Sequence, residues 1–314
     1  MVVRKFNYYR FFIFIVVLIG IIVLCVKLIS NHNYKKTYDY KLGLVGYSES
    51  EIKTLKEKLK NENIDELLNK KYDKDISEFV NQKYFLYRNL DKYIQYKKEH
   101  KLEDYNNIVA LINTDANIDW MENEKLTDTS KGNLMLVNRI YGLDENYVPE
   151  DIVDAPVQYA YNGIKISETA LDKIMEMIED AKSDNFSFIL ADGYRSYSTQ
   201  KEIYDSYKRS YGERAADDQV ARPGHSDYQT GLSFSIVPYN KVYDKPKESE
   251  EYKWLTDNAY KYGFIFRFPE DKTKLTGFEA FTWRLRYVGS EAATIIHNEN
   301  ICFEEYYAYY VDKE

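Results

Sequence analysis

An uninterrupted apolar segment near the N-terminus is the strongest hydrophobic feature of the chain. It covers residues 11–26 and extends, past one lysine, to residue 29. At 1.5 Å per helical residue, about 19 residues are close to the minimum that crosses a bilayer. Three basic residues and no acid precede it, which predicts a cytoplasmic tail over residues 1–10. No small-x-small cleavage motif follows, so the pattern favours an uncleaved transmembrane signal anchor at residues 11–30 over a cleaved signal peptide.

A helical pattern with charged faces follows the apolar segment. Ser48 and Glu51 have the spacing of a capping box, and apolar residues follow them at helical intervals. Lys- and Glu-rich amphipathic segments continue to about residue 111. We expect a stalk and a small helical region over residues 31–130, with solvated charged faces; a dedicated partner-binding helix pair is the alternative.

From residue 131 onward the pattern alternates between helix and strand. Ser167 precedes a single apolar stripe typical of a helix. Strands are expected at "FSFILA" (186–191), "FIFRF" (264–268) and "FTWRLRYVG" (281–289). The alternation lacks βαβ regularity and a Gly-rich phosphate loop, so residues 131–314 are predicted to form an α+β domain.

Charge and cysteine content limit the function classes. The chain has 314 residues and a net charge of −8; four basic residues and no acid lie in the first 30, so the remainder carries −12. An acidic surface argues against nucleic-acid binding. Cys302 is the only cysteine beyond the apolar segment, so the outer part has no intrachain disulfide.

Four ordered segments carry a family resemblance. They are "DGYRSYSTQ" (192–200), "ARPGHSDYQTGL" (221–232), "NAYKYGFIFRFP" (258–269) and "LTGFEAFTWRLRYVG" (275–289). In this order and spacing they closely resemble the zinc D-alanyl-D-alanine carboxypeptidases of the VanY type, over roughly residues 131–300. The resemblance implies a carboxypeptidase-like domain with a small antiparallel sheet flanked by helices.

The metal positions of that family are replaced in this chain. In the family, two histidines and an aspartate bind Zn²⁺ and a glutamate acts as general base for the metal-bound water. Tyr228 and Arg284 stand at the histidine positions, Ser235 at the aspartate position and Phe281 at the glutamate position. A phenol and a hydroxyl are weak zinc donors at neutral pH, arginine repels a dication, and phenylalanine cannot transfer a proton. We therefore expect no metal cofactor and no functional catalytic residue.

A relocated metal site is the alternative interpretation. His225 and His297 are the histidines within the resembling region, and Glu279 is the nearest candidate for a displaced carboxylate. Metal ligation requires tight geometry, which makes this set the weaker hypothesis.

The remaining matches to the family frame predict a ligand-binding cleft. The candidate ligand-binding residues are Arg195, Gln200, Ser226, Gln229, Arg284 and Tyr287. The structural alternative is that most of them preserve the fold, with Arg286 in a buried pair. Two guanidinium groups in one cleft, Arg195 and Arg284, would favour a carboxylate. The rival expectation is that Arg284 pairs with Asp227 or Glu279 and closes the cleft.

Three functions follow from this interpretation. The leading one is a membrane-anchored, extracytoplasmic pseudoenzyme that binds a peptidoglycan stem peptide, or another carboxylate-ended peptide, or regulates cell-wall enzymes. The second is an active carboxypeptidase with a non-standard site. The third is a structural scaffold with cell-envelope protein partners.

Overall fold

The chain folds into two compact units, which we describe separately. The computed structural model describes residues 8–118 and 123–312. The units are Met1–Val109 and Ala110–Glu314. The domain boundaries expected from the sequence stay predictions.

The first helix, α1 (Tyr8–Lys35), contains the apolar segment. Its stretch Phe11–Lys35 is long and apolar enough to cross a membrane, and none of its most apolar window is buried inside the protein. Exposed apolar side chains, such as Phe12 and Ile22, are what lipid contact requires. The helix is consistent with a membrane anchor.

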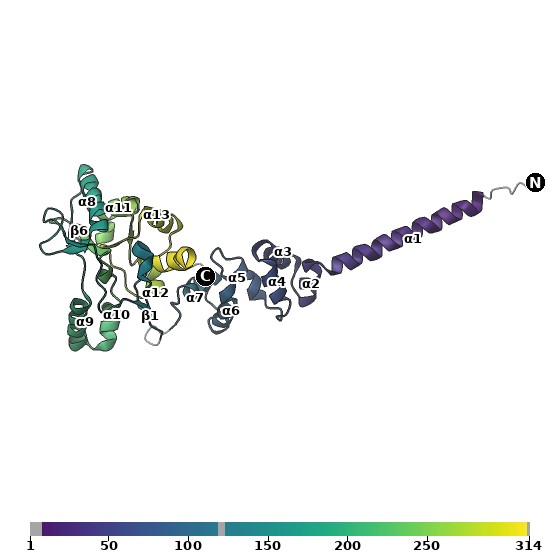
Figure 1. The fold of residues 1–314 in the computed structure, drawn as a ribbon, viewed down its shortest axis with the longest axis horizontal. Coiled ribbons are helices and arrows are strands. Elements are labelled where there is room, and N and C mark those ends of the chain that lie inside the picture. Colours follow the sequence, from purple (N-terminus) through teal and green to yellow (C-terminus); the bar gives the residue numbers. More distant parts are fainter. Residues whose placement is uncertain (1–7, 119–122, 313–314) are drawn as a thin grey trace, which may run out of the picture. The chain divides into compact units, whose positions relative to one another are not determined.

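The rest of the first unit is a small helical bundle (Figure 1). Its helices are α2 (Tyr38–Val45), α3 (Glu49–Lys58), α4 (Asn61–Leu67), α5 (Lys74–Val80), η1 (Tyr87–Asn89), α6 (Leu90–Glu99) and the start of α7 (Tyr105–Asn113). The expected capping box begins α3: the Ser48 amide donates to Glu51 Oε2 at 2.8 Å, and the Glu51 amide donates to Ser48 Oγ at 3.4 Å. Leu55, Phe79 and Tyr93 are fully buried in this unit.

The second unit contains the predicted mixture of helices and small antiparallel sheets. Its strands are β1 (Lys125–Leu126), β2 (Tyr141–Gly142), β3 (Ile152–Asp154), β4 (Lys165–Ser167), β5 (Phe188–Asp192), β6 (Ser233–Pro238), β7 (Phe264–Phe266) and β8 (Arg284–Tyr287). Its longer helices are α8 (Glu168–Ser183), α9 (Tyr197–Tyr211), α10 (Glu213–Gln219), α11 (Glu250–Asn258) and α13 (Ser290–Glu299). Shorter helical turns are η2 (Thr129–Leu134), η3 (Asp227–Thr230), η4 (Pro246–Glu248), η5 (Ala259–Tyr262), η6 (Glu270–Lys272), α12 (Thr273–Thr276), α14 (Phe303–Tyr306) and η7 (Tyr307–Val311).

The central sheet has four antiparallel strands in the order β5-β6-β8-β7. The stripe of α8 predicted from the sequence, including Leu171, Ile174 and Ile178, is buried in the same core as Phe234 and Leu285 of the sheet. The helix therefore packs its apolar face against the sheet, as amphipathic helices do.

The strand expected over residues 281–289 is shorter than predicted. β8 begins only at Arg284, because a turn precedes it in which the Arg284 amide donates to the Phe281 carbonyl at 3.4 Å. Within the sheet, Ser235 of β6 lies opposite Arg284. Two positions that are 49 residues apart in the sequence are thus direct neighbours.

A buried ionic cluster holds the segments around the sheet together. Asp227 accepts from Arg267 Nε at 3.2 Å and from Arg286 Nη1, and Arg267 also pairs with Glu304, at 2.7 Å. Both arginines are fully buried. Arg286 also donates to the carbonyls of Asn133 and Met135 at 3.1 and 3.0 Å. The cluster joins η3, the residue after β7, β8, α14 and the 133–135 segment, and it confirms Arg286 in a buried pair.

The pKa values of the two arginines follow from this arrangement. Burial alone lowers the pKa of a guanidinium, but the charges of Glu304 and Asp227 outweigh it and raise the pKa of Arg267. At Arg286 burial dominates over the Asp227 charge, so its pKa is lowered. Since free arginine titrates above about 12, both stay charged at neutral pH.

The buried cluster makes a testable contribution to stability. Asp227→Asn leaves the buried guanidinium of Arg286 without a carboxylate and that of Arg267 with Glu304 alone, and we expect it to lower the free energy of unfolding by about 3–5 kcal/mol. The measurement is urea unfolding of the purified full chain in mild detergent, followed by tryptophan fluorescence.

The matched control is Asp154→Asn. The Asp154 side chain is 73% exposed and pairs with Lys165 at 3.1 Å. Exposed pairs contribute little, so the change should stay within about 1 kcal/mol. Equal effects of the two substitutions would contradict a structural role for the Asp227 cluster.

Candidate functional site

The four residues predicted at the three metal-ligand positions and the general-base position come together in one place. Tyr228 lies in η3, and its hydroxyl is 2.7 Å from Ser235 Oγ of β6. The guanidinium carbon of Arg284 is 4.4 Å from the centre of the Tyr228 ring and 4.3 Å from that of the Phe281 ring. On the Tyr228 ring lies a second guanidinium, that of Arg195, at 4.3 Å. The site is therefore a stack of cations and aromatic rings.

Local structure positions each member of the stack. Arg195 follows β5 in the loop that leads into α9, and its amide donates to the Tyr228 carbonyl at 3.3 Å. Ser196 caps α9 by accepting from the Thr199 amide at 3.1 Å. Tyr228 directly follows Asp227, whose carboxylate is fixed in the buried cluster. Arg284 is held as the first residue of β8.

The donor set at this site does not fit a zinc ion. The Tyr228 hydroxyl and Ser235 Oγ are hydrogen-bonded to each other, and both are neutral donors of low basicity. Arg284 occupies the third of the predicted metal-ligand positions, and its permanent positive charge repels a dication.

The alternative ligand set does not converge either. His225 is buried, with Nδ1 2.8 Å from the Asn138 carbonyl and Nε2 3.0 Å from Glu124 Oε1. His297 is exposed and stacks on Tyr260 at 3.9 Å. Within residues 8–118 and 123–312, no three His, Cys, Asp or Glu side chains group as a metal site. The structure therefore does not bring His225, His297 and Glu279 together.

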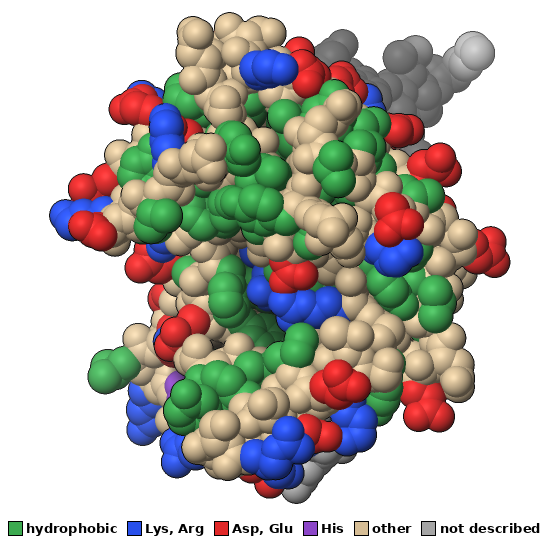
Figure 2. All heavy atoms as spheres, turned by 90° about the vertical axis from the view of Figure 1, so that its left-hand side faces the viewer, with side chains coloured by type: hydrophobic (Ala, Val, Ile, Leu, Met, Phe, Trp, Pro, Cys, Tyr) green, Lys and Arg blue, Asp and Glu red, His purple; other side chains and the backbone are tan. Residues whose placement is uncertain are grey.

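A cavity of about 120 Å³ opens at the stack. It is lined by Arg195, Gln200, Ile203, Gln219, Val220, Ala221, Ser226, Tyr228, Phe268, Phe278, Phe281 and Arg284. Figure 2 shows a hollow in the middle of one face, with basic side chains and an acidic one in it and hydrophobic side chains along its edges. Ligand pockets typically exceed about 300 Å³, so this cavity suits the end group of a ligand and not a whole peptide.

The two arginines of the cavity differ in their partners. Arg195 forms an ion pair with Asp192 and donates to Gln200 Oε1 at 3.4 Å. Arg284 forms no ion pair and no side-chain hydrogen bond with any residue that the structure describes, and its Nε is buried without a partner. The expected pairing of Arg284 with Asp227 or Glu279 is wrong, because Asp227 is taken by Arg267 and Arg286 and Glu279 is exposed. The cavity retains one uncompensated cation.

Four of the six predicted ligand-binding residues line the cavity. Arg195, Gln200, Ser226 and Arg284 do so. Gln229 is fully buried, and its amide nitrogen donates to the carbonyls of Asp144 and Tyr147 at 3.1 and 3.2 Å. Tyr287 packs on Phe264, with ring centres 5.5 Å apart. These two side chains therefore lie outside the cavity.

Sequence reasoning missed several parts of the site. Phe268 and Phe278 narrow the cavity, and Asp192 neutralises Arg195. Asp192 stands three residues before Arg195 in the 192–200 motif, so the sequence itself could have indicated this ion pair. The two phenylalanines reach the cavity only through the fold.

A second ionic pair supports the wall of the cavity. Asp217 of α10 accepts from Arg222 Nη2 and Nε, both at 2.8 Å, and from the Tyr204 hydroxyl at 2.6 Å. Burial opposes ionisation of Asp217, but the bonds from Arg222 and Tyr204 outweigh it and lower the pKa of this carboxyl. Burial and the bond to Asp217 raise the pKa of Tyr204 to about 12. The pair fixes the segment that leads into the 221–232 motif.

Known proteins share this domain. A family model for VanY D-alanyl-D-alanine carboxypeptidases matches residues 163–290. The putative carboxypeptidase YodJ of Bacillus subtilis (strain 168) is 38% identical over 181 residues, which is 55% of this chain and 66% of that protein. This chain thus spans about two thirds of that relative.

Two solved structures are also similar to this chain. The LdcB LD-carboxypeptidase, whose structure addresses peptidoglycan recognition, is 36% identical with a TM-score of 0.56, over 59% of this chain and 90% of that one. VanYB, solved in complex with D-alanine-D-alanine, is 33% identical with a TM-score of 0.50, over 58% of this chain and 98% of that one.

The chemistry of Tyr228, Ser235 and Arg284 predicts how much zinc the purified protein retains. We expect the purified full chain to retain well below one zinc per chain after equilibration with micromolar zinc, measured by elemental analysis. A variant with Tyr228→His, Ser235→Asp and Arg284→His restores three ligands and should retain about one zinc. Stoichiometric zinc in the unaltered chain would contradict the assignment.

The Asp217 pair predicts a pH-dependent contribution to stability. Because the folded pKa of Asp217 lies below its unfolded value, the stabilisation is complete above about pH 4 and is lost as pH falls through the folded pKa. Asp217→Asn should therefore lower the free energy of unfolding by about 1–3 kcal/mol at pH 7 and have a smaller effect at pH 3. Urea unfolding at both pH values checks this. An equal effect at pH 7 and pH 3 would show that the carboxylate charge is irrelevant.

Proposed function

Because the chain belongs to the VanY family of D-alanyl-D-alanine carboxypeptidases, we propose that its second unit binds the carboxylate end of a peptidoglycan stem peptide without hydrolysing it. The membrane anchor would hold this unit at the outer face of the cell membrane, with the N-terminus in the cytoplasm. The protein would act there as a binding or regulatory module of the cell wall.

The unpaired guanidinium of Arg284 is the observation that carries the proposal. It lines the cavity, stacks on Tyr228 and Phe281, and has no carboxylate partner among the residues described. Stacking fixes the orientation of the planar group while leaving hydrogen-bond donors for a ligand. Since Asp192 compensates Arg195, the cavity favours a ligand with a single negative charge.

The relatives support the choice of ligand. VanYB was solved with D-alanine-D-alanine, a dipeptide that ends in one carboxylate. The small cavity matches such an end group. The Arg284 side chain would provide the positive charge that a metal ion supplies in other members of the family.

Hydrolysis is the second candidate, because family membership favours it. Peptide hydrolysis needs an activated water and a group that accepts its proton. Tyr228, Ser235 and Phe281 supply no such base near the cavity, which supports binding without turnover. A pure scaffold role would require that no stem peptide binds.

A binding experiment tests the proposal. The probe is a peptide ending in Lys-D-Ala-D-Ala with both lysine amines acetylated, titrated by calorimetry into the full chain in mild detergent. We expect saturable binding and no release of D-alanine. Arg284→Ala should weaken binding about tenfold to a hundredfold, which corresponds to the loss of one charged hydrogen-bonded pair.

Two controls accompany this titration. Arg209 is exposed on α9 and does not line the cavity, so Arg209→Ala should leave the affinity unchanged. The same peptide with a C-terminal carboxamide should bind at least tenfold more weakly. Unchanged affinity in Arg284→Ala, or catalytic release of D-alanine, would overturn the proposal.

A further inference from the structure

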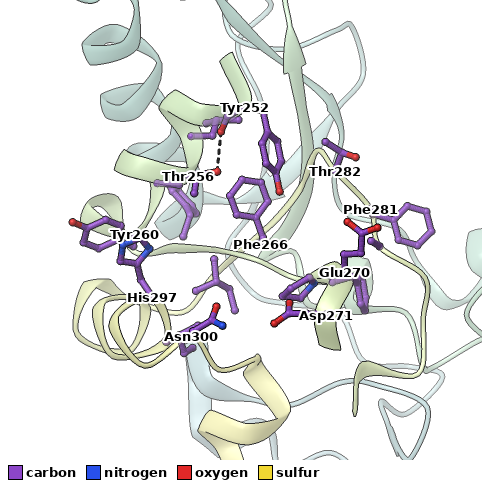
Figure 3. Close-up of a pocket in the computed structure, with 18 of the residues that line it drawn as sticks. Tyr252, Thr256, Tyr260, Phe266, Glu270, Asp271, Phe281, Thr282, His297 and Asn300 are labelled. Atoms are coloured by element: carbon purple, nitrogen blue, oxygen red, sulfur yellow. Dashed lines mark hydrogen bonds between the residues drawn. The ribbon is translucent and has the colours of Figure 1, made fainter. Parts of the chain in front are cut away.

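A second cavity of the second unit adjoins the Arg284 cavity. It has a volume of about 320 Å³ and is bordered by α11, η5, β7, η6, the turn before β8 and α13. Figure 3 shows Glu270 and Phe281 on the side of this cavity opposite Tyr252. Phe268 and Phe281 line both cavities, so the two belong to one cleft. A separate surface lies in the first unit, where the chain leaves the apolar segment.

The residues that follow the apolar segment lie at the depth of lipid headgroups. The segment ends at Ile29, and α1 continues to Lys35. At 1.5 Å per residue, Tyr34 is about 8 Å beyond Ile29, and the headgroup layer is about 5–8 Å thick on each side of a bilayer. When the apolar segment fills the hydrocarbon core, Tyr34 and Lys35 therefore lie in this layer. Tyrosine rings are enriched at that depth.

Helix α2 begins beside the end of α1. A tight turn joins the two helices, in which the Thr37 amide and hydroxyl donate to the Tyr34 carbonyl at 2.9 and 2.7 Å. The rings of Tyr34 and Tyr40 pack edge to face, with centres 5.5 Å apart. Because α2 has eight residues, it is about 12 Å long. No residue of α2 is therefore far from the lipid surface.

The two faces of α2 differ in what they contact. Leu42 is fully buried, whereas the Leu44 side chain is 71% exposed. Lys41 is exposed as well, and it stands three residues before Leu44. Residues at this spacing share one face of a helix, so Lys41 and Leu44 lie together on the face turned away from Leu42. Such a face can place an apolar side chain against lipid tails and a cation among the headgroups.

Positive charge is concentrated where α1 passes into α2. Residues 27–41 contain four lysines and one acid. Residues 42–109 contain 13 Lys or Arg and 13 Asp or Glu, so they carry no net charge. The excess positive charge that follows the apolar segment in the first unit therefore lies next to that segment.

The lysines of this segment are available to an external anion. The single acid, Asp39, forms an ion pair with Lys56 of α3 at 2.6 Å, and this hydrogen bond lowers the pKa of Asp39. The side chains of Lys35, Lys36 and Lys41 are exposed, and they form no ion pair with any residue that the structure describes. The protein itself thus leaves three ammonium groups uncompensated.

We propose that residues 34–44 are a lipid-contact segment, which binds anionic phospholipids of the outer leaflet. Lys35, Lys36 and Lys41 donate to the lipid phosphate groups, and Leu44 lies at the upper end of the lipid tails. The attraction acts within a Debye length, about 8–10 Å at physiological ionic strength, and the position of the segment satisfies this condition. The inference rests on the membrane anchor and not on peptide binding by the second unit.

Two observations favour a phospholipid over a soluble anion. The three lysines are spread over the end of α1, the turn and the exposed face of α2, which suits an array of phosphate groups better than one enclosed anion. A soluble anion would also leave Leu44 in water, whereas lipid tails remove its apolar surface from water.

The test uses the full chain in vesicles, with Leu44→Trp as a fluorescent reporter. The vesicles contain phosphatidylcholine and phosphatidylglycerol in equal amounts. In one preparation the phosphatidylcholine is brominated close to its headgroup, and in the other the phosphatidylglycerol is brominated at the same place. Bromine quenches tryptophan only at contact, so the two preparations report which lipid lies beside residue 44. The chain without the reporter supplies the background from its native tryptophans.

We expect both brominated lipids to quench the reporter, and brominated phosphatidylglycerol to do so about two- to tenfold more strongly. Replacing the three lysines in Lys35→Gln/Lys36→Gln/Lys41→Gln should remove this preference, because the charge that enriches the anionic lipid is gone. High salt should weaken the preference in the unaltered lysine background.

The matched control removes the same charge elsewhere in the helical bundle. Lys74 of α5, Lys92 of α6 and Lys101 are exposed and lie outside the lipid-contact segment. The variant Lys74→Gln/Lys92→Gln/Lys101→Gln should therefore keep the preference for phosphatidylglycerol.

Four results would overturn the inference. Residue 44 lies in water if neither lipid quenches the reporter. Equal quenching by the two lipids, or loss of the preference in both triple variants, contradicts recognition of anionic lipid by this segment. Loss of the preference in sodium phosphate, but not in sodium chloride of equal ionic strength, assigns the lysines to a soluble anion. Release of the chain from vesicles by alkaline carbonate removes the anchor itself. The stem-peptide titration is independent of all four, so failure of the proposed function is distinguishable.

Discussion

The carboxylate of Asp227, buried between Arg267 and Arg286, is the interaction on which the rest of the second unit depends. The four buried charges of Asp227, Arg267, Arg286 and Glu304 are tolerated because each finds partners. These partners come from η3, the residue after β7, β8, α14 and the segment before β2. The cluster therefore fixes η3 against the sheet. Tyr228 is the next residue after Asp227, so the buried cluster also fixes the position of Tyr228.

The buried ions hold the elements that carry the cavity residues. The residues that the resemblance predicts at the zinc positions lie together, and they are a phenol bonded to a hydroxyl and an arginine stacked on two rings. The uncompensated cation of the cavity is the Arg284 side chain. A bound dication activates a water as well as attracting an anion, whereas a guanidinium donates hydrogen bonds to an anion and does not activate a water.

Local patterns predicted the parts of the fold that depend on local interactions. The Ser48 capping box, the buried stripe of α8 and the α+β class follow from spacing alone, and the four motifs located the cleft. The pairing of residues far apart in sequence was not predictable. Gln229 stands in a motif beside Tyr228, yet its amide binds the carbonyls of Asp144 and Tyr147. The place of Phe281 in the walls of two neighbouring cavities follows only from the turn before β8 in the folded chain.

The most direct test of the central claim is an X-ray structure of the full chain with zinc and a D-Ala-D-Ala-ended peptide, with data collected at the zinc absorption edge. The account predicts the terminal carboxylate of an intact peptide within hydrogen-bond distance of the Arg284 guanidinium, and no anomalous peak beside Tyr228 and Ser235. A zinc peak at that position, with a cleaved peptide, would contradict it.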